Sequence, residues 1–191
     1  MKSIILTAGL LAVLATALAA QQIPPTPEEL ALFEAAHNGQ LTDVERLVAA
    51  GTTVDAMDEE NRTPMMFAAF NGHRQVGSVL LTRGANVDSK DVSGRTGLMY
   101  ASSGPYVETV EVLLDAGAGV NTQGSLEGFT ALMTAAAEGQ TEIVRLLLER
   151  GADPTLKDVD GDTALSFAQQ AGHTAVVEML TKSATKGENT D

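Results

Sequence analysis

One alanine position recurs along this chain at an almost constant interval, and that period restricts the fold more than any other feature. Successive occurrences are separated by 33, 33, 34 and 33 residues, at Ala35, Ala68, Ala101, Ala135 and Ala168. Four of them are the sixth residue of a similar phrase: T-P-M-M-F-A-A from Thr63, T-G-L-M-Y-A-S from Thr96, T-A-L-M-T-A-A from Thr130 and T-A-L-S-F-A-Q from Thr163. A fixed period of about 20–50 residues is typical of a solenoid, in which each unit buries its apolar face only against neighbouring units.

Each repeat reads as two short helices followed by a polar loop. In residues 61–93, Thr63 is suited to cap a helix that begins at Pro64, and Asn71-Gly72 is suited to end it. A second helix is expected from about His73 to the stop at Gly84. The residues that follow are polar and rich in glycine, which predicts an extended hairpin-like finger that leads into the next unit.

The same order of signals recurs along most of the chain and resembles the ankyrin repeat. That family's phrase T-P-L-H-x-A is followed by G-H, L-L and G-A-D, which match Gly72-His73, Gly172-His173, the pairs Leu80/Leu81, Leu113/Leu114 and Leu147/Leu148, and Gly84-Ala85-Asn86 and Gly151-Ala152-Asp153. The resemblance implies an all-α solenoid of helix-turn-helix units with β-hairpin-like finger loops. It covers residues 27–183, as units 27–60, 61–93, 94–127, 128–160 and 161–183.

Two departures from the family pattern are informative. The family's usual His, which links neighbouring repeats by hydrogen bonds, is replaced by Met66, Met99, Met133 and Ser166. At the methionines, adaptable apolar packing is expected in place of those hydrogen bonds. The third unit has Ser102-Ser103-Gly104-Pro105-Tyr106 in place of a regular helix end, and its finger carries one extra residue. This irregular segment is either a functional site or a tolerated loop variation.

The N-terminal residues have a different composition from the repeats. Lys2 is followed by an uncharged run to Ala20. Within it, Ala17-Leu18-Ala19 has small residues at the two positions that a signal peptidase recognises. We expect residues 1–19 to be a cleaved secretory signal, residues 20–26 a Pro-rich linker and residues 184–191 a polar disordered tail. The alternative is an uncleaved membrane anchor; once the signal is cleaved, no stable membrane insertion is expected.

Composition and motifs argue against several classes of function. The net charge is −13 with no Lys/Arg stripe, so nucleic acid is not expected as a partner. There is no cysteine, which excludes disulfides and thiolate metal sites. No nucleophile elbow or phosphate-binding loop occurs, so we expect no enzyme, no cofactor and no metal.

The sequence of one finger resembles a calcium-binding loop. Its carboxylates alternate through Lys157-Asp158-Val159-Asp160-Gly161-Asp162, but the glutamate that closes such loops is missing. Asp158 and Gly161 are also residues that a repeat finger requires. A calcium- or small-ligand-responsive protein therefore stays an alternative function, as does a membrane-tethered scaffold.

The resemblance places the partner surface on finger tips and first helices. Bulky apolar side chains at positions free to be polar, such as Phe70 and Phe129, suit interface anchors, although both could instead fold back onto adjacent repeats. The candidate residues are Glu59, Glu60, Arg62, Phe70, Asn71, Val92, Arg95, Ser103, Tyr106, Leu126, Phe129 and Glu138. We expect a non-catalytic periplasmic or secreted module that binds another exported protein, an enzyme of that compartment, through its concave face, and inhibits or protects it.

Overall fold

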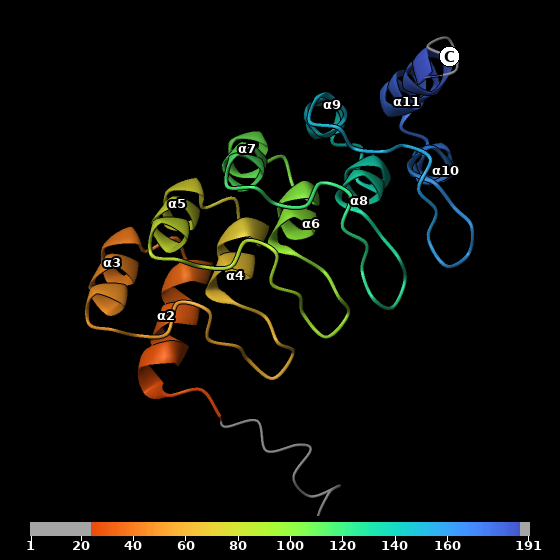
Figure 1. The fold of residues 1–191 in the computed structure, drawn as a ribbon. Coiled ribbons are helices and arrows are strands. Elements are labelled where there is room, and N and C mark those ends of the chain that lie inside the picture. The colour runs from red at the N-terminus through yellow and green to blue at the C-terminus, as the bar shows by residue number, and fades with distance from the viewer. Residues whose placement is uncertain (1–23, 188–191) are drawn as a thin grey trace, which may run out of the picture.

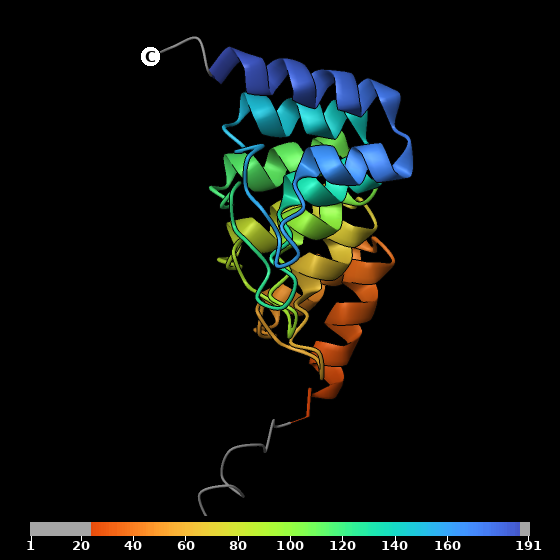
Figure 2. The ribbon, with the colours of Figure 1, turned by 90° about the vertical axis from the view of Figure 1, so that its right-hand side faces the viewer.

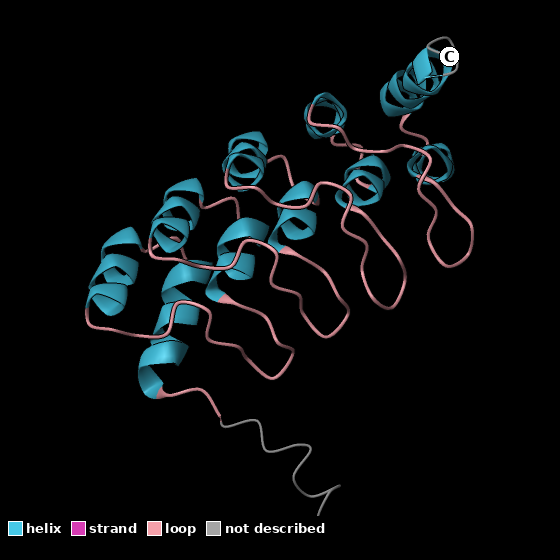
Figure 3. Ribbon diagram, in the orientation of Figure 1, coloured by secondary structure: helices cyan, strands magenta, loops and turns pink. Residues whose placement is uncertain are grey.

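The structure, a computed structural model, describes residues 24–187, and the signal segment expected at residues 1–19 lies outside this range. In the described part every regular element is an α-helix, which confirms the all-α solenoid (Figure 3). The helices are α2 (Pro27–His37), α3 (Leu41–Ala49), α4 (Pro64–Phe70), α5 (Arg74–Thr82), α6 (Gly97–Ser102), α7 (Val107–Asp115), α8 (Ala131–Ala137), α9 (Thr141–Glu149), α10 (Ala164–Ala171) and α11 (Thr174–Gly187).

The helices form two parallel rows (Figures 1 and 2). The inner row contains α2, α4, α6, α8 and α10, and the outer row contains α3, α5, α7, α9 and α11. Each helix contacts the next member of its own row and its partner in the other row. The finger loops project beside the inner row, so inner helices and fingers together line one side of the stack.

The threonine of each repeat phrase starts an inner helix as expected. The hydroxyls of Thr63, Thr96 and Thr130 accept the backbone N–H three residues further on, at 3.4, 3.5 and 3.2 Å. Thr163 does the same, and Thr26 caps the first helix in a reciprocal arrangement with Glu29. These bonds satisfy N–H groups that a helix start otherwise leaves without a partner.

The core lies between the two rows and contains mostly aliphatic side chains. Met66, Met99 and Met133 are 2, 3 and 2% exposed, so the methionines pack in the interior as expected. The outer helices contribute Leu80, Leu113 and Leu147, all of which are buried. Alanines of the inner helices belong to the same buried cluster, and their small side chains allow those helices to approach closely.

Helix boundaries differ from the sequence expectation at the C-terminal end. The last helix continues to Gly187, so residues 184–187, expected to belong to a disordered tail, are helical. No glycine or proline occurs between Thr174 and Lys186, so the sequence contains no residue that would end the helix earlier. The remainder of the expected tail, residues 188–191, lies outside the described range.

Candidate binding surface

The fingers are stacked on one another by main-chain hydrogen bonds. The N–H groups of Val92, Ser125 and Val159 donate to carbonyl oxygens of the preceding finger, at 2.9, 2.9 and 3.0 Å. Asp58 folds its own finger, because its Oδ1 accepts the N–H groups of residues 60 and 62. Asp91 and Asp158 make the equivalent bonds, so the Asp158 carboxylate, which belongs to the alternative calcium-loop interpretation, holds the shape of its finger.

Two arginines at equivalent positions each stack on an aromatic ring of the following helix. The guanidinium of Arg62 lies 5.0 Å from the ring centre of Phe67, and that of Arg95 lies 4.9 Å from Tyr100. Arg62 forms ion pairs with Asp58 at 2.7 Å and with Glu60 at 3.0 Å. Within the described residues Arg95 pairs with a single carboxylate, Asp91, at 2.9 Å. These contacts orient both side chains along the inner side of the stack.

The environment of Asp91 stabilises its charged form. Burial would raise its pKa, but the Tyr100 hydroxyl donates to it at 2.7 Å and Arg95 adds backbone and side-chain hydrogen bonds, so its pKa lies below the usual value. Burial and the same carboxylate raise the pKa of Tyr100 to about 12. The hydrogen bond to Asp58 raises the pKa of Arg62. All three groups therefore keep fixed charge states near neutral pH.

The stacked arginines border a hollow on this side of the stack. Its volume is about 250 Å³, and it is lined by His37, Arg62, Met66, Phe67, Phe70, Arg95 and Tyr100. Phe70 is 50% exposed, and its ring meets the edge of Tyr100 with ring centres 6.0 Å apart. One side of the Phe70 ring therefore packs on the next repeat, and the other side faces solvent; its role as an interface anchor stays a prediction.

Two smaller hollows continue along the same side toward the C-terminus. The first, about 160 Å³, is lined by Ser93, Arg95, Gly124, Leu126, Glu127 and Phe129. The second, about 130 Å³, is lined by Phe129, Met133, Thr134, Ala137, Glu138 and Phe167. Because Arg95 borders the first two hollows and Phe129 borders the last two, the three form one surface, which we call the inner groove.

The structure brings half of the candidate residues into the inner groove. Arg62, Phe70, Arg95, Leu126, Phe129 and Glu138 line its hollows. Glu59, Glu60 and Val92 lie on neighbouring finger tips, and Val92 is 53% exposed. The Asn71 amide contacts the His37 ring and donates to the Phe67 carbonyl, while the Ser103 hydroxyl donates to the Tyr100 carbonyl, so both bond to neighbouring backbone or side chains.

Tyr106 occupies a structural position shared by one residue in each repeat. Its ring lies so close to Gly72 and Gly104 that a Cβ atom at either glycine would overlap it. His73 stands at the same position one repeat earlier and donates to the carbonyl of His37 at 2.9 Å. The irregular third unit therefore keeps the contact between repeats, with the phenol ring of Tyr106 in place of the imidazole.

Sequence reasoning missed the aromatic residues that form the walls of the groove. Phe67, Tyr100 and Phe167 sit at the same position of their repeats, directly after the residue that replaces the family's His. The recurrence of an aromatic residue at that position of the repeat is the signal in the sequence that points to them. Across residues 24–187 no cluster of ligands for a metal ion occurs, and no helix has the length and apolar character needed to cross a membrane.

Comparison with known proteins identifies the repeat throughout the described chain. A family profile described as ankyrin repeats (3 copies) matches residues 32–124 and again residues 106–191. Ankyrin repeat family A protein 2 of Mus musculus is 52% identical over 48 residues, which is 25% of this chain and 15% of that protein.

Two further relatives share the repeat within much longer proteins. Potassium channel AKT3 of Oryza sativa subsp. japonica is 44% identical over 62 residues, or 32% of this chain and 7% of its own length. The human ARF GTPase-activating protein GIT1 is 46% identical over 54 residues, or 28% of this chain and 7% of its own length. The matches thus span only a small part of each relative, and the likeness concerns the repeat itself.

Proposed function

The chain belongs to the ankyrin repeat family, and on that basis we propose that it is a non-catalytic module that binds another exported protein in its inner groove. Ankyrin repeats generally serve protein–protein interaction. The observation that carries the proposal is the continuity of the three hollows, which runs along the stack from Phe70 to Phe167. Exposed apolar groups inside and beside it, such as Leu126 at 64% exposure, are typical of interface anchors.

The geometry favours a steric mechanism. Each repeat is held to its neighbours by buried helix contacts and by the bonds between fingers, so the groove is formed before any partner arrives. A preformed surface loses little conformational entropy on binding. The bound protein would be covered over the length of the groove, which would inhibit it or protect it.

The location of the protein is part of the proposal and rests on residues 1–20, which lie outside the described range. Their uncharged run after Lys2 and the small residues before Gln21 favour export with removal of the segment. The partner would then be an exported protein, and an enzyme of the periplasm is the proposed case. Mass spectrometry of the mature N-terminus in the native host tests this step: a start at Ala20 or Gln21 supports it, and a start at Met1 favours the membrane-tethered alternative.

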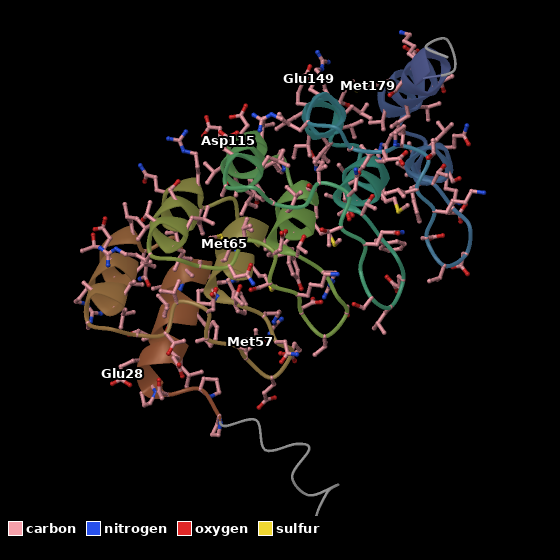
Figure 4. The ribbon with its side chains drawn as sticks, viewed as in Figure 1. Glu28, Met57, Met65, Asp115, Glu149 and Met179 are labelled. Carbon is pink, nitrogen blue, oxygen red and sulfur yellow. The ribbon has the colours of Figure 1, made fainter. Side chains whose placement is uncertain are left out.

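Affinity capture tests the groove itself. The chain from Ala20 onward would be used to retain proteins from a periplasmic extract, beside a variant carrying Phe70→Ala, Arg95→Ala and Phe129→Ala. A control variant, Glu111→Ala with Glu149→Ala, alters exposed positions on the outer helices α7 and α9. Figure 4 shows Glu149 on α9, well away from the fingers.

The outcomes separate the possible binding faces. The proposal expects a protein that is retained by the unchanged chain and by the control but lost by the groove variant, while circular dichroism shows all three folded. Equal retention by the groove variant would move the site to another face. Loss only with the outer-helix control would overturn the proposal.

A further inference from the structure

The C-terminal hollow of the inner groove is shaped by a pair of aromatic rings. Phe129 and Phe167 meet edge to face, with ring centres 5.2 Å apart and planes at 83°. Met133 and Ala137 add apolar walls, so the floor of the hollow offers ring surface and aliphatic carbon. Glu138 caps helix α8 and lines the same hollow with an exposed carboxylate.

The charge in this hollow has no counterion among residues 24–187. Neither Lys nor Arg lines it, and Glu138 makes no ion pair with any residue of the described chain. Glu127, in the adjoining hollow, is likewise without an ion pair among residues 24–187. The N-terminal hollow differs, because Arg62 and Arg95 are already paired with carboxylates. The C-terminal half of the groove therefore presents uncompensated negative charge beside aromatic surface.

We propose that this hollow binds a cationic side chain, arginine or lysine, from an extended segment of the partner protein. The proposal rests on the proposed function and names the chemistry that the groove selects. The aliphatic stem would lie against the rings of Phe129 and Phe167, and the charged end would reach Glu138. A cation over an aromatic face and a nearby carboxylate reinforce each other, whereas a lone exposed ion pair contributes little.

The N-terminal hollow would receive a different part of the same partner segment. In the N-terminal hollow the arginines are compensated, so the side chain bound beside Phe70 and Tyr100 would be apolar and uncharged. The partner segment is thus basic toward the C-terminal end of the inner groove and apolar toward its N-terminal end. With a net charge of −13, the chain as a whole also attracts such a segment over a distance.

Nuclear magnetic resonance titration with Nα-acetyl-arginine methylamide tests the hollow without any knowledge of the partner. The same titration is repeated with the citrulline analogue, which has nearly the same shape and no charge. We expect saturable shifts of the Met133, Thr134 and Ala137 methyl signals with the arginine derivative, and binding of the citrulline analogue weaker by at least about fivefold.

Matched variants decide whether the contact is local. Glu138→Gln and Phe167→Leu should each abolish the difference between the two ligands, because one removes the charge and the other the ring. Glu149→Gln removes the same charge from the outer helix α9 and should leave the difference unchanged. Equal binding of both ligands, no saturable shift, or an equal effect of Glu149→Gln would overturn the inference. The groove could still capture its partner in each of those cases, so failure here is distinguishable from failure of the proposed function.

Discussion

The imidazole of His173 bridges two repeats, because its Nε2 atom donates to the carbonyl oxygen of Ala137 at 3.0 Å. His73 makes the same bond to the carbonyl of His37 at 2.9 Å, one hundred positions earlier in the sequence. Both rings lie against a glycine of the preceding turn, Gly139 and Gly39. The turn histidine therefore fixes the spacing of two neighbouring units by one hydrogen bond and one close contact.

This relationship predicts that Gly139→Ala is more destabilising than Gly151→Ala. Both glycines have positive φ, +68° and +87°, so an alanine is strained at either, by roughly 1–2 kcal/mol. A Cβ at Gly139 would also lie 2.6 Å from the His173 ring, whereas nothing lies within 4 Å at Gly151. Chemical denaturation should show an additional cost of about 1–3 kcal/mol for Gly139→Ala. Equal losses in the two variants would contradict the contact.

The buried leucine of the central repeat should contribute far more stability than an exposed leucine on a finger. Leu113 is 1% exposed and Leu126 is 64% exposed. We expect Leu113→Ala to lower the free energy of unfolding by roughly 2–5 kcal/mol, because it leaves a cavity between rows. Leu126→Ala should change it by less than about 0.5 kcal/mol. Urea denaturation of both variants measures the difference, and similar values would contradict the assigned core.

Side-chain carboxylate and amide oxygens in the loops accept backbone N–H groups of the next repeat and so form a ladder along the stack. This ladder should contribute more to the free energy of unfolding than surface ion pairs do. Asp88 accepts the N–H of Gly119 at 2.9 Å, and Asp55 and Asn121 make equivalent bonds to the next repeat. We expect Asp88→Ala to cost about 1 kcal/mol, because it leaves a backbone donor without its partner. Asp115, which pairs with Arg150 at 2.7 Å on the outer helices, is 68% exposed.

Asp115→Ala is therefore the matched control for Asp88→Ala. Asp115 lies on the outer helix α7 (Figure 4), and its ion pair with Arg150 is exposed to solvent. Exposed pairs contribute about 0.2–1 kcal/mol and weaken in salt. Thermal denaturation at low and high salt should separate the two variants. The effect of Asp115→Ala should diminish at high salt, and the effect of Asp88→Ala should persist. If the effect of Asp88→Ala diminished at high salt and that of Asp115→Ala persisted, the ladder would contribute nothing to stability.

Tyr100 should make stability fall at alkaline pH. Its pKa is raised from 10.0 to about 12 in the folded protein, so the unfolded chain releases this proton first as pH rises. The stabilising contribution is complete below about pH 10 and is lost progressively as the pH approaches 12. In a Tyr106→Phe background, ultraviolet titration reports Tyr100 alone, since the chain has two tyrosines.

Asp91→Asn provides the control for this titration. It removes the carboxylate that accepts the Tyr100 hydroxyl at 2.7 Å, so the pKa of Tyr100 should fall toward its ordinary value. An unchanged pKa in the Asp91→Asn variant would mean that burial alone raises it. The same variant should leave the finger folded, because the amide oxygen can still accept the N–H groups of Ser93 and Arg95 while its NH2 group faces the Tyr100 oxygen.

The sequence by itself determined the repeats, the helix starts and the core. These features depend on residues close together in the chain: Thr63 caps the helix that begins at the next residue, and Leu113 is buried because it recurs on one helix face. The period then determines the stacking, since each unit has an apolar face that only a neighbour can cover. The position of half of the candidate residues in one groove follows from that stacking.

Only the tertiary structure decided what the groove offers chemically. The pairing of Phe129 with Phe167 joins two repeats, and whether Arg95 is free or paired depends on how Asp91 and Tyr100 fold back onto it. The ring of Tyr106, a candidate binding residue, packs on Gly72 of the previous unit, a contact between repeats. Such contacts depend on the exact rotation and spacing of adjacent repeats, which the local pattern of residues does not specify.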